Sequence, residues 1–298
     1  MELRQLEYFV AVAEEANFTR AAQRVHISQS GISAQIRQLE HDLGATLIDR
    51  STRTATLTQE GEAVLEHARA TLAAARAVRQ AVDDVRELVR GRLVVGMVTA
   101  CTVRGLFDAL SEFHLAHPGV EITLVEDNSE RLVEQVREGS LDLALVGTAT
   151  GPPDGLTSMT IISEGIVGAV PPDHPLAGRT KVTLADIADY PIVSMPRGTG
   201  VRTVFDRACG VAGIVPNIAL QASAPAAVAD LAARGLGVAI LSESMFSDIE
   251  DRLSVLAIDD VGIPAVLGLV WKRPEGPALR ELLRHGRKAF GKPAAAPA

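Results

Sequence analysis

The stretch from residue 59 to residue 90 constrains the fold most, because it contains no proline and its single glycine, Gly61, lies near its start. Thr58 precedes it and can cap a helix. Apolar residues recur along it mostly in steps of three and four, the spacing of one helix face: Leu65, Ala68, Leu72, Ala75, Val78, Val82, Val85 and Val89. We predict one long linker helix over residues 59–90. Exposed, this helix would leave the stripe in water, so we expect a partner helix, most simply from a second subunit.

Residues 1–58 predict three short helices and a wing. Leu3, Leu6, Phe9, Val10 and Ala13 recur at helical spacing in the first helix. Thr19 is expected to cap the second helix, and Ser28 the third, which ends at Gly44. Residues 46–50 and 54–58 resemble two brief strands. Two short helices joined tightly and followed by a capped third are typical of a helix-turn-helix, so we predict an all-α winged helix-turn-helix.

After Gly91 the pattern changes to strands that alternate with helices. Such alternation predicts a parallel sheet covered on both faces. We expect an α/β domain over residues 91–290 with two lobes: lobe I at about 91–163 and 265–290, and lobe II at about 164–264. The last strand, 265–271, and the helix 277–290 would then return to lobe I. Residues 291–298 are rich in proline and alanine, and we expect a disordered tail there.

A long ordered motif connects the N-terminal part to a known family. It consists of FTRAA at 18–22, ISQSGISAQIRQLE at 27–40, LGATLIDR at 43–50 and LTQEG at 57–61. The motif closely resembles the signature of LysR-type transcriptional regulators. The resemblance implies a linker helix followed by a two-lobed, periplasmic-binding-protein-like (type II) effector domain. It thus covers nearly the whole chain, and the expected function is sequence-specific DNA binding modulated by a small-molecule effector.

The third helix carries the candidate DNA-reading residues. In a helix-turn-helix, the N-terminal part of this helix enters the major groove. Gln29, Ser30, Ser33 and Arg37 fall on its polar side, opposite Ile32, Ile36 and Leu39. Glutamine can pair with adenine, serine can contact several base edges, and arginine favours guanine or phosphate.

Arginines of the N-terminal part are candidates for phosphate contacts. Most acids of residues 1–58 lie in the first helix, whereas Arg20, Arg24, Arg50 and Arg53 lie in the helix-turn-helix and wing. This segregation suits phosphate positioning. We take Arg50 and Arg53 as DNA-binding candidates, and Arg20 and Arg24 as equally well explained as ordinary surface arginines.

Two turns of the α/β domain are candidates for the effector site, as the family resemblance implies. The turn after the first strand contains Thr99, Ala100, Cys101 and Thr102, whose hydroxyls and N–H groups at a helix start suit an anion or a carboxylate. The second-lobe turn RGTGVR at 197–202 supplies Gly198, Thr199 and Arg202. Ser129 and Thr148, after the next two strands, match further wall positions. Alternatively, Ser129, Thr99, Thr102 and Thr199 are simply helix caps.

Composition excludes several other classes. The chain has 298 residues, of which 47% are hydrophobic and 22% charged, and a net charge of −8, which argues against non-specific coating of nucleic acid. Cys101 and Cys209 are too far apart for a disulfide framework, and the seven histidines show no metal-ligand spacing. A low-pKa redox role for Cys101 is the minor alternative. We expect no metal, no cofactor and no catalytic residue.

The expected partners are double-stranded promoter DNA at an operator, a small-molecule effector for which an anion is one candidate, and a second copy of the chain in a homodimer or homotetramer. RNA polymerase is a further candidate partner. No apolar stretch is long enough to span a membrane and no signal-peptide core follows Met1, so we expect a cytoplasmic protein. Two alternatives stay open: a small-molecule (solute) binding protein without DNA function, and an enzyme that uses the α/β cleft.

Overall fold

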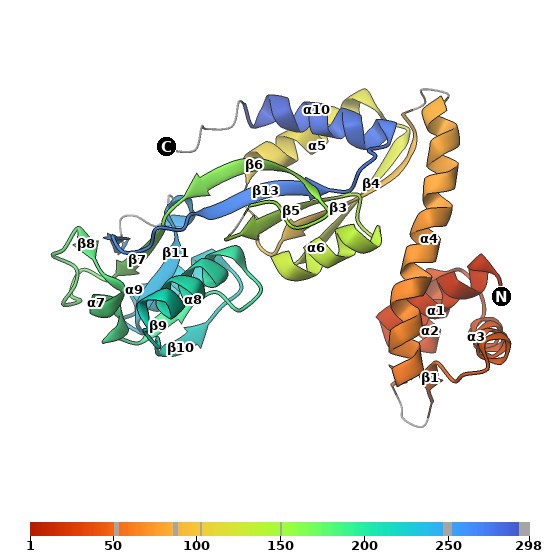
Figure 1. The fold of residues 1–298 in the computed structure, drawn as a ribbon, viewed down its shortest axis with the longest axis horizontal. Coiled ribbons are helices and arrows are strands. Elements are labelled where there is room, and N and C mark those ends of the chain that lie inside the picture. The colour runs from red at the N-terminus through yellow and green to blue at the C-terminus, as the bar shows by residue number, and fades with distance from the viewer. Residues whose placement is uncertain (51–53, 86–88, 102, 150, 247–251, 292–298) are drawn as a thin grey trace. The chain divides into compact units, whose positions relative to one another are not determined.

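The computed structural model describes residues 1–50, 54–85, 89–101, 103–149, 151–246 and 252–291. The chain divides into two compact units, Met1–Leu88 with Glu138–Ser140, and Val89–Arg137 with Leu141–Ala298. Figure 1 gives the order of the elements along the chain. Among the described residues, no helix is both long and apolar enough to cross a membrane.

The first unit is the expected winged helix-turn-helix and long helix. Its elements are α1 (Leu3–Glu15), α2 (Phe18–Arg24), α3 (Gln29–Leu43), β1 (Ile48–Asp49), β2 (Thr56–Leu57) and α4 (Gln59–Val85). The wing strands β1 and β2 pair antiparallel and are shorter than predicted. The side chains of Phe9, Val12, Ile32, Ile36 and Leu39 are fully buried and form the core. Apolar periodicity therefore predicted the buried face of α3 correctly, but that of α1 only in part, because Leu6 and Phe9 are buried whereas Leu3 is 45% exposed.

The caps of these helices are partly as expected. Ser28 Oγ accepts a hydrogen bond from Gly31 N, and Gly44 ends α3 with a left-handed φ of 69°. Thr58 Oγ1 likewise accepts from Gly61 N at the start of α4. The prediction that Thr19 caps α2 is wrong, because the cap is Asn17, two residues earlier, whose Oδ1 accepts from Thr19 N and Arg20 N. Asparagine is as good a cap as threonine, so sequence spacing alone did not separate them.

The apolar stripe of α4 is covered in part by its own chain. Ala68 and Leu72 are 2% and 9% exposed and belong to the same core as α1. This part of the stripe therefore needs no second subunit, contrary to our expectation for the whole helix. Val78, further along, is 69% exposed.

The second unit contains two sheets. In lobe I the order is β4 (Val120–Asp127), β3 (Gly91–Val98), β5 (Leu143–Thr148), β13 (Ala265–Trp271) and β6 (Thr157–Glu164). Strand β3 is parallel to β4 and β5, whereas β13 is antiparallel to β5 and β6. The expected parallel sheet is thus correct for β3, β4 and β5 and wrong for β13, and β6, of which no residue is fully buried, was not predicted.

Helices cover both faces of the lobe I sheet (Figure 1). Helices α5 (Arg104–Ala116) and α10 (Pro277–Ala289) lie side by side on one face, and α6 (Ser129–Glu138) lies on the other. Leu145 and Trp271 pack with the first pair, whereas Val146 and Val270 pack with α6. Successive strand residues point to opposite faces, which is why these neighbours join different cores.

Lobe II has a six-stranded mixed sheet. Its order is β10 (Ile218–Gln221), β9 (Ile192–Ser194), β11 (Val238–Ser242), β7 (Ile166–Val170), β12 (Ser254–Ile258) and β8 (Lys181–Val182). The helical elements are α7 (Leu184–Ala188), α8 (Gly200–Ala212), α9 (Pro225–Ala233) and the 3₁₀ turn η1 (Glu243–Phe246). Strand β9 is parallel to β10 and β11, but β7 is antiparallel to β11 and β12. Strands β8 and β12, helix α7 and the 3₁₀ turn η1 were not predicted from the sequence.

Candidate functional sites

The polar side of α3 faces outward. Gln29, Ser30 and Arg37 are exposed and Ser33 is half-buried. The opposite side of the helix, formed by Ile32, Ile36 and Leu39, is fully buried. Packing therefore fixes which face of α3 is presented to a ligand in solution.

The residues at the start of α3 differ in their freedom to bind. Ser30 Oγ lies 3.2 Å from Ser28 Oγ, so the two hydroxyls share a hydrogen bond. No hydrogen bond or ion pair of Arg37 is recorded within the described part of the chain, and its guanidinium is exposed. An exposed guanidinium without a competing carboxylate can bind a base edge or a phosphate at little cost.

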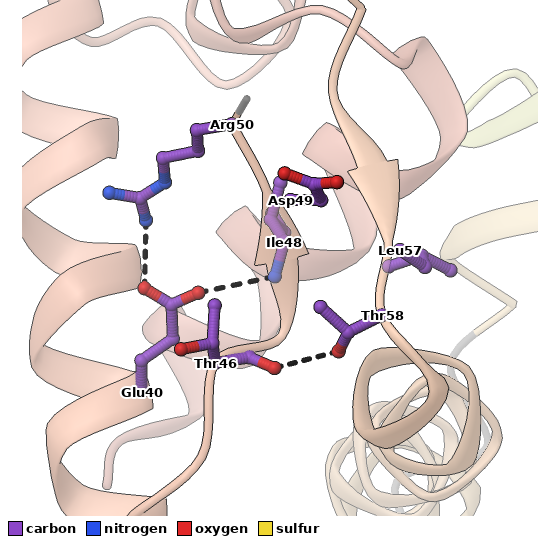
Figure 2. Close-up of a pocket in the computed structure, with 7 residues that line it drawn as sticks. All are labelled: Glu40, Thr46, Ile48, Asp49, Arg50, Leu57 and Thr58. Atoms are coloured by element: carbon purple, nitrogen blue, oxygen red, sulfur yellow. Dashed lines mark hydrogen bonds and ion pairs between the residues drawn. The ribbon is translucent and has the colours of Figure 1, made fainter. Parts of the chain in front are cut away.

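Glu40 joins the recognition helix to the wing. Its Oε1 accepts a hydrogen bond from Leu47 N at 2.9 Å. As Figure 2 shows, Oε1 also accepts from Ile48 N, at 3.2 Å, and Oε2 accepts from Arg50 Nη2, at 2.8 Å. The Arg50 guanidinium also lies over the Phe18 ring, 5.4 Å from the centroid. We call these contacts the Glu40 clasp. The clasp holds Arg50 in one place and leaves its side chain one-third exposed. Arg53 lies outside the described residues.

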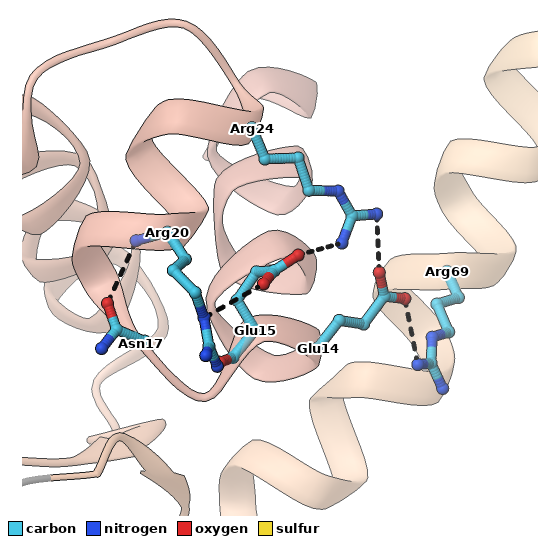
Figure 3. A network of polar contacts seen from close by, with 6 residues as sticks. All are labelled: Glu14, Glu15, Asn17, Arg20, Arg24 and Arg69. Atoms are coloured by element: carbon cyan, nitrogen blue, oxygen red, sulfur yellow. Dashed lines mark hydrogen bonds and ion pairs between the residues drawn. The ribbon is translucent and has the colours of Figure 1, made fainter.

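Arg20 and Arg24 have partners inside the unit. Arg20 pairs with Glu15, and Arg24 pairs with Glu14 and Glu15 (Figure 3). Glu14 also binds Arg69 of α4, at 3.2 Å. The expected segregation of charge is therefore wrong for these two arginines, because the fold brings the acids of α1 against α2. Arg20 and Arg24 serve the packing of the unit rather than a free basic surface.

In lobe I, candidate effector residues follow the carboxyl ends of neighbouring parallel strands. Thr99 follows β3, Ser129 follows β4, and Thr148 ends β5. Thr99 is exposed and its N–H donates to Asp127 O at 3.2 Å, which ties the ends of β3 and β4 together. Strand order thus gathers at one sheet edge residues that are distant in sequence, where open α/β sheets bind ligands.

Ser129 does not cap its helix. Its Oγ accepts a hydrogen bond from Gly147 N at 2.9 Å, and Ser129 is buried, with only 5% of its surface exposed. The neighbouring Asn128 caps α6 instead, since its Oδ1 accepts from Arg131 N. The capping alternative for Ser129 is therefore wrong, and its hydroxyl connects α6 to the end of β5.

In lobe II, the turn before α8 contacts lobe I directly. Gly198 has a φ of 87°, and its carbonyl accepts from Glu130 N at 3.4 Å. A Cβ on Gly200 would lie 2.6 Å from the carbonyl carbon of Gly147. Only glycine permits this approach of the two backbones. Thr199 is the N-cap residue of α8, but its hydroxyl donates to Pro196 O and makes no cap bond.

Arg202 is buried, with 5% exposed. Its Nε donates to Asp206 Oδ1 at 2.7 Å, and its Nη1 donates to Met195 O and to Gln221 Oε1, both at 3.2 Å. These contacts fasten α8 to the ends of β9 and β10. Arg202 therefore positions the turn, which its place in the sequence did not reveal.

Cys101 does not have the properties of a reactive thiol. It is half-buried, and burial is the main reason that the pKa of its thiol is raised. A lowered pKa is what a thiol needs for rapid oxidation. Ala100, beside it, has a left-handed φ of 57°. Thr102 lies outside the described residues.

Comparisons with known proteins identify both the helix-turn-helix unit and the two-lobed α/β unit. Residues 3–62 match the family of bacterial regulatory helix-turn-helix proteins of lysR type, and residues 86–291 match the LysR substrate binding domain. The chain belongs to the LysR family of transcriptional regulators. It is 35% identical over 284 residues to the HTH-type transcriptional regulator ShiR of Corynebacterium glutamicum (strain R), covering 94% of this chain and 96% of ShiR.

Solved LysR-type structures have the same fold. Full-length CbnR in complex with its target DNA matches with a TM-score of 0.62 and 28% identity, over 97% of this chain and all of that one. Full-length OxyR from Pseudomonas aeruginosa gives a TM-score of 0.71 over the whole chain at 21% identity, which concerns the fold alone. This LysR-type protein is thus a DNA-binding transcriptional regulator with an effector-binding domain. The alternative of a solute-binding protein without DNA function is wrong.

Sequence reasoning missed several residues that shape the sites of this LysR-type regulator. Glu40, Asn128 and Gly147 were not singled out. Glu40 is one acid among many on helices, and nothing in the sequence shows that its acceptors face the wing. Gly147 interrupts an otherwise apolar strand, and this is a signal for close backbone approach that could have been used.

Proposed function

We propose that this regulator reads its operator through the polar face of α3. Gln29, Ser30, Ser33 and Arg37 would contact base edges, and Arg50 would contact a phosphate. The main support for this proposal is that this face of α3 is exposed whereas the opposite face is fully buried. Arg53 joins the proposal on sequence grounds alone.

We propose that the effector is a small anionic molecule bound where the two lobes meet. Its direct contacts would come from the strand-end turns, which hold Thr99, Ala100, Cys101, Thr102, Ser129 and Thr148, and from Gly198 and Thr199. Arg202 would act by holding the second turn in place. The N-cap residues of α5 and α8 make no side-chain cap hydrogen bond, and uncapped N–H groups at a helix start favour a negatively charged ligand.

We propose that the active form is a homo-oligomer, a dimer or a tetramer, in which α4 pairs with a partner around the exposed Val78. The functional division would be 1–58 for DNA, 59–90 for linkage and 91–290 for the effector. Because the protein binds DNA, we also propose that it contacts RNA polymerase at the promoter and that it is located in the cytoplasm. We propose no catalytic activity.

The DNA proposal is tested by pulling down genome fragments with the purified protein at near-physiological salt, followed by sequencing. Arg37→Ala should lose the enriched motif, since a base-contacting arginine contributes about 1–3 kcal/mol of discrimination. Arg207→Ala is the matched control, because Arg207 is an exposed arginine of lobe II. Equal enrichment by wild type and Arg37→Ala would refute the assignment of α3.

The effector proposal is tested by thermal shift against a panel of small carboxylates. Thr99→Ala and Thr199→Ala should each weaken the response to a compound that stabilises the wild type. If both variants respond as the wild type does, the turns are not the site.

A further inference from the structure

Three side chains with metal-binding chemistry meet on the outer surface of lobe I. His117, Glu281 and His285 each offer one ligand atom, and these atoms all lie within 4.8 Å of one another. His117 is the C-cap residue of α5, and Glu281 and His285 are one turn apart on α10. The two helices lie side by side in Figure 1. We call this the α5–α10 cluster.

His117 has an unsatisfied ring nitrogen. Its Nε2 is buried and makes no hydrogen bond with any residue that the structure describes, and Glu281 Oε2 is 3.9 Å away. Buried polar atoms are nearly always hydrogen-bonded, so an orphaned one requires an explanation. A ligand between Nε2 and the carboxylate would supply it.

The surroundings of the cluster are apolar on one side. Phe113 is fully buried, and its ring lies 5.0 Å from the His117 ring and 6.1 Å from the His285 ring. The side chain of His285 is 9% exposed, that of His117 22% and that of Glu281 30%. Two mostly buried imidazoles and one carboxylate, with one open side, are the ligand set of three-residue zinc sites.

A second carboxylate lies behind His285. Glu112 Oε2 is 3.4 Å from His285 Nδ1 and 2.9 Å from Lys288 Nζ. Metal-binding histidines commonly donate their other ring N–H to a carboxylate, and this orients the ring. His285 would then present Nε2 to the metal.

A cation already occupies part of this position. Arg284 Nη2 is 2.8 Å from Glu281 Oε2 and 3.4 Å from His285 Nε2. The Arg284 side chain is 61% exposed, so it can swing into solvent at small cost. The guanidinium is thus a competitor that a metal would have to displace.

We propose that His117, Glu281 and His285 form a binding site for a divalent transition metal of the zinc class. Zinc–nitrogen and zinc–oxygen bonds of about 2.0–2.2 Å place tetrahedral ligands about 3.4 Å apart, so the cluster must contract by up to roughly 1.4 Å. Rotation of Glu281 and His117 provides this movement. Calcium and magnesium prefer all-oxygen sites and do not fit two imidazoles. Bound metal would clamp the end of α5 to α10, independently of DNA and effector.

The experiment titrates tag-free, full-length protein with Zn²⁺ in competition with a chromophoric chelator. The expected result is one tight site per chain, weakened at least tenfold by His117→Ala and by Glu281→Gln. Arg284→Gln should tighten the site, because it removes the competing cation. His114→Ala is the matched control, since His114 is an exposed histidine one turn earlier on α5. Co²⁺ in place of Zn²⁺ should give the visible absorption of a tetrahedral site.

The fold of each variant is checked by the near-UV circular dichroism of Trp271, which packs in the same core as α5 and α10. If His117→Ala fails to fold, Glu281→Gln decides the same question. The proposal is overturned if no saturable site appears, or if His114→Ala weakens binding as much as His117→Ala.

Discussion

The Glu40 clasp makes a quantitative prediction about how the recognition helix and the wing are held together. Glu40→Ala removes the acceptor of two backbone N–H groups and one partner of the Arg50 ion pair. Hydrogen bonds to a charged acceptor contribute about 1.5–3 kcal/mol each when buried. Glu40 borders an open pocket (Figure 2), so water can replace part of this, and about 1 kcal/mol per N–H remains. The partly exposed ion pair adds less than about 1 kcal/mol.

The expected loss of local stability is therefore about 2–3 kcal/mol. It corresponds to a roughly 30- to 150-fold larger equilibrium constant for local opening. Hydrogen exchange at the amides of Leu47 and Ile48 measures it directly. Glu40→Gln keeps an acceptor for both amides and should lose about half as much. Glu7→Ala is the control, because Glu7 is an exposed helical glutamate whose side chain forms no hydrogen bond or ion pair within the described part of the chain. Unchanged exchange in Glu40→Ala would refute the clasp.

Three further predictions follow. Gly200→Ala should destabilise the effector-binding unit by about 1–3 kcal/mol in urea unfolding, since the new Cβ would meet the Gly147 backbone. The control is Gly210→Ala on the same helix, whose Cβ would meet no atom within 4 Å and which should leave stability unchanged. Equal effects of the two variants would contradict the close approach of Gly200 to Gly147. Burial raises the pKa of Cys209 to about 11. Cys209 should therefore react with a thiol reagent at pH 8 a few hundredfold more slowly than an ordinary cysteine with a pKa of about 8.5. Rapid labelling of the folded protein would be inconsistent with this. The pKa of Asp186 is lowered, chiefly through the Thr183 backbone hydrogen bond. The stabilising effect of Asp186 is therefore present above about pH 4 and is lost as the pH falls through the pKa of the folded state. The thermal midpoints of Asp186→Ala and wild type should differ at pH 7 and converge below pH 4.

The sequence predicted most elements whose apolar pattern is regular. The third helix, with its Ser28 cap and Gly44 stop, was predicted at both ends, because these signals are local. Short or half-buried elements such as β6 and β12 were missed, because their pattern depends on neighbours distant in sequence. The same limit explains Asn17, which competed with an equally good cap nearby.

The candidate sites divide in the same way. The exposure of Gln29, Ser30 and Arg37 follows from helical periodicity, because the opposite face must be buried. The α5–α10 cluster could not be predicted, since His117 and His285 are brought together only by two helices packing on one sheet face.

The amino-acid sequence by itself thus determined the family, the helix-turn-helix and the order of the strands and helices that have a regular apolar pattern, because motifs and periodicity are properties of contiguous residues. Tertiary structure alone decided which polar groups are committed. It paired Arg20 and Arg24 with the acids of α1, turned Ser129 toward Gly147 and buried Arg202 among its acceptors. It also left the Nε2 of His117 without a hydrogen bond among the described residues. Hydrogen bonds and ion pairs act over a few ångströms in space, and distance along the chain does not set that separation.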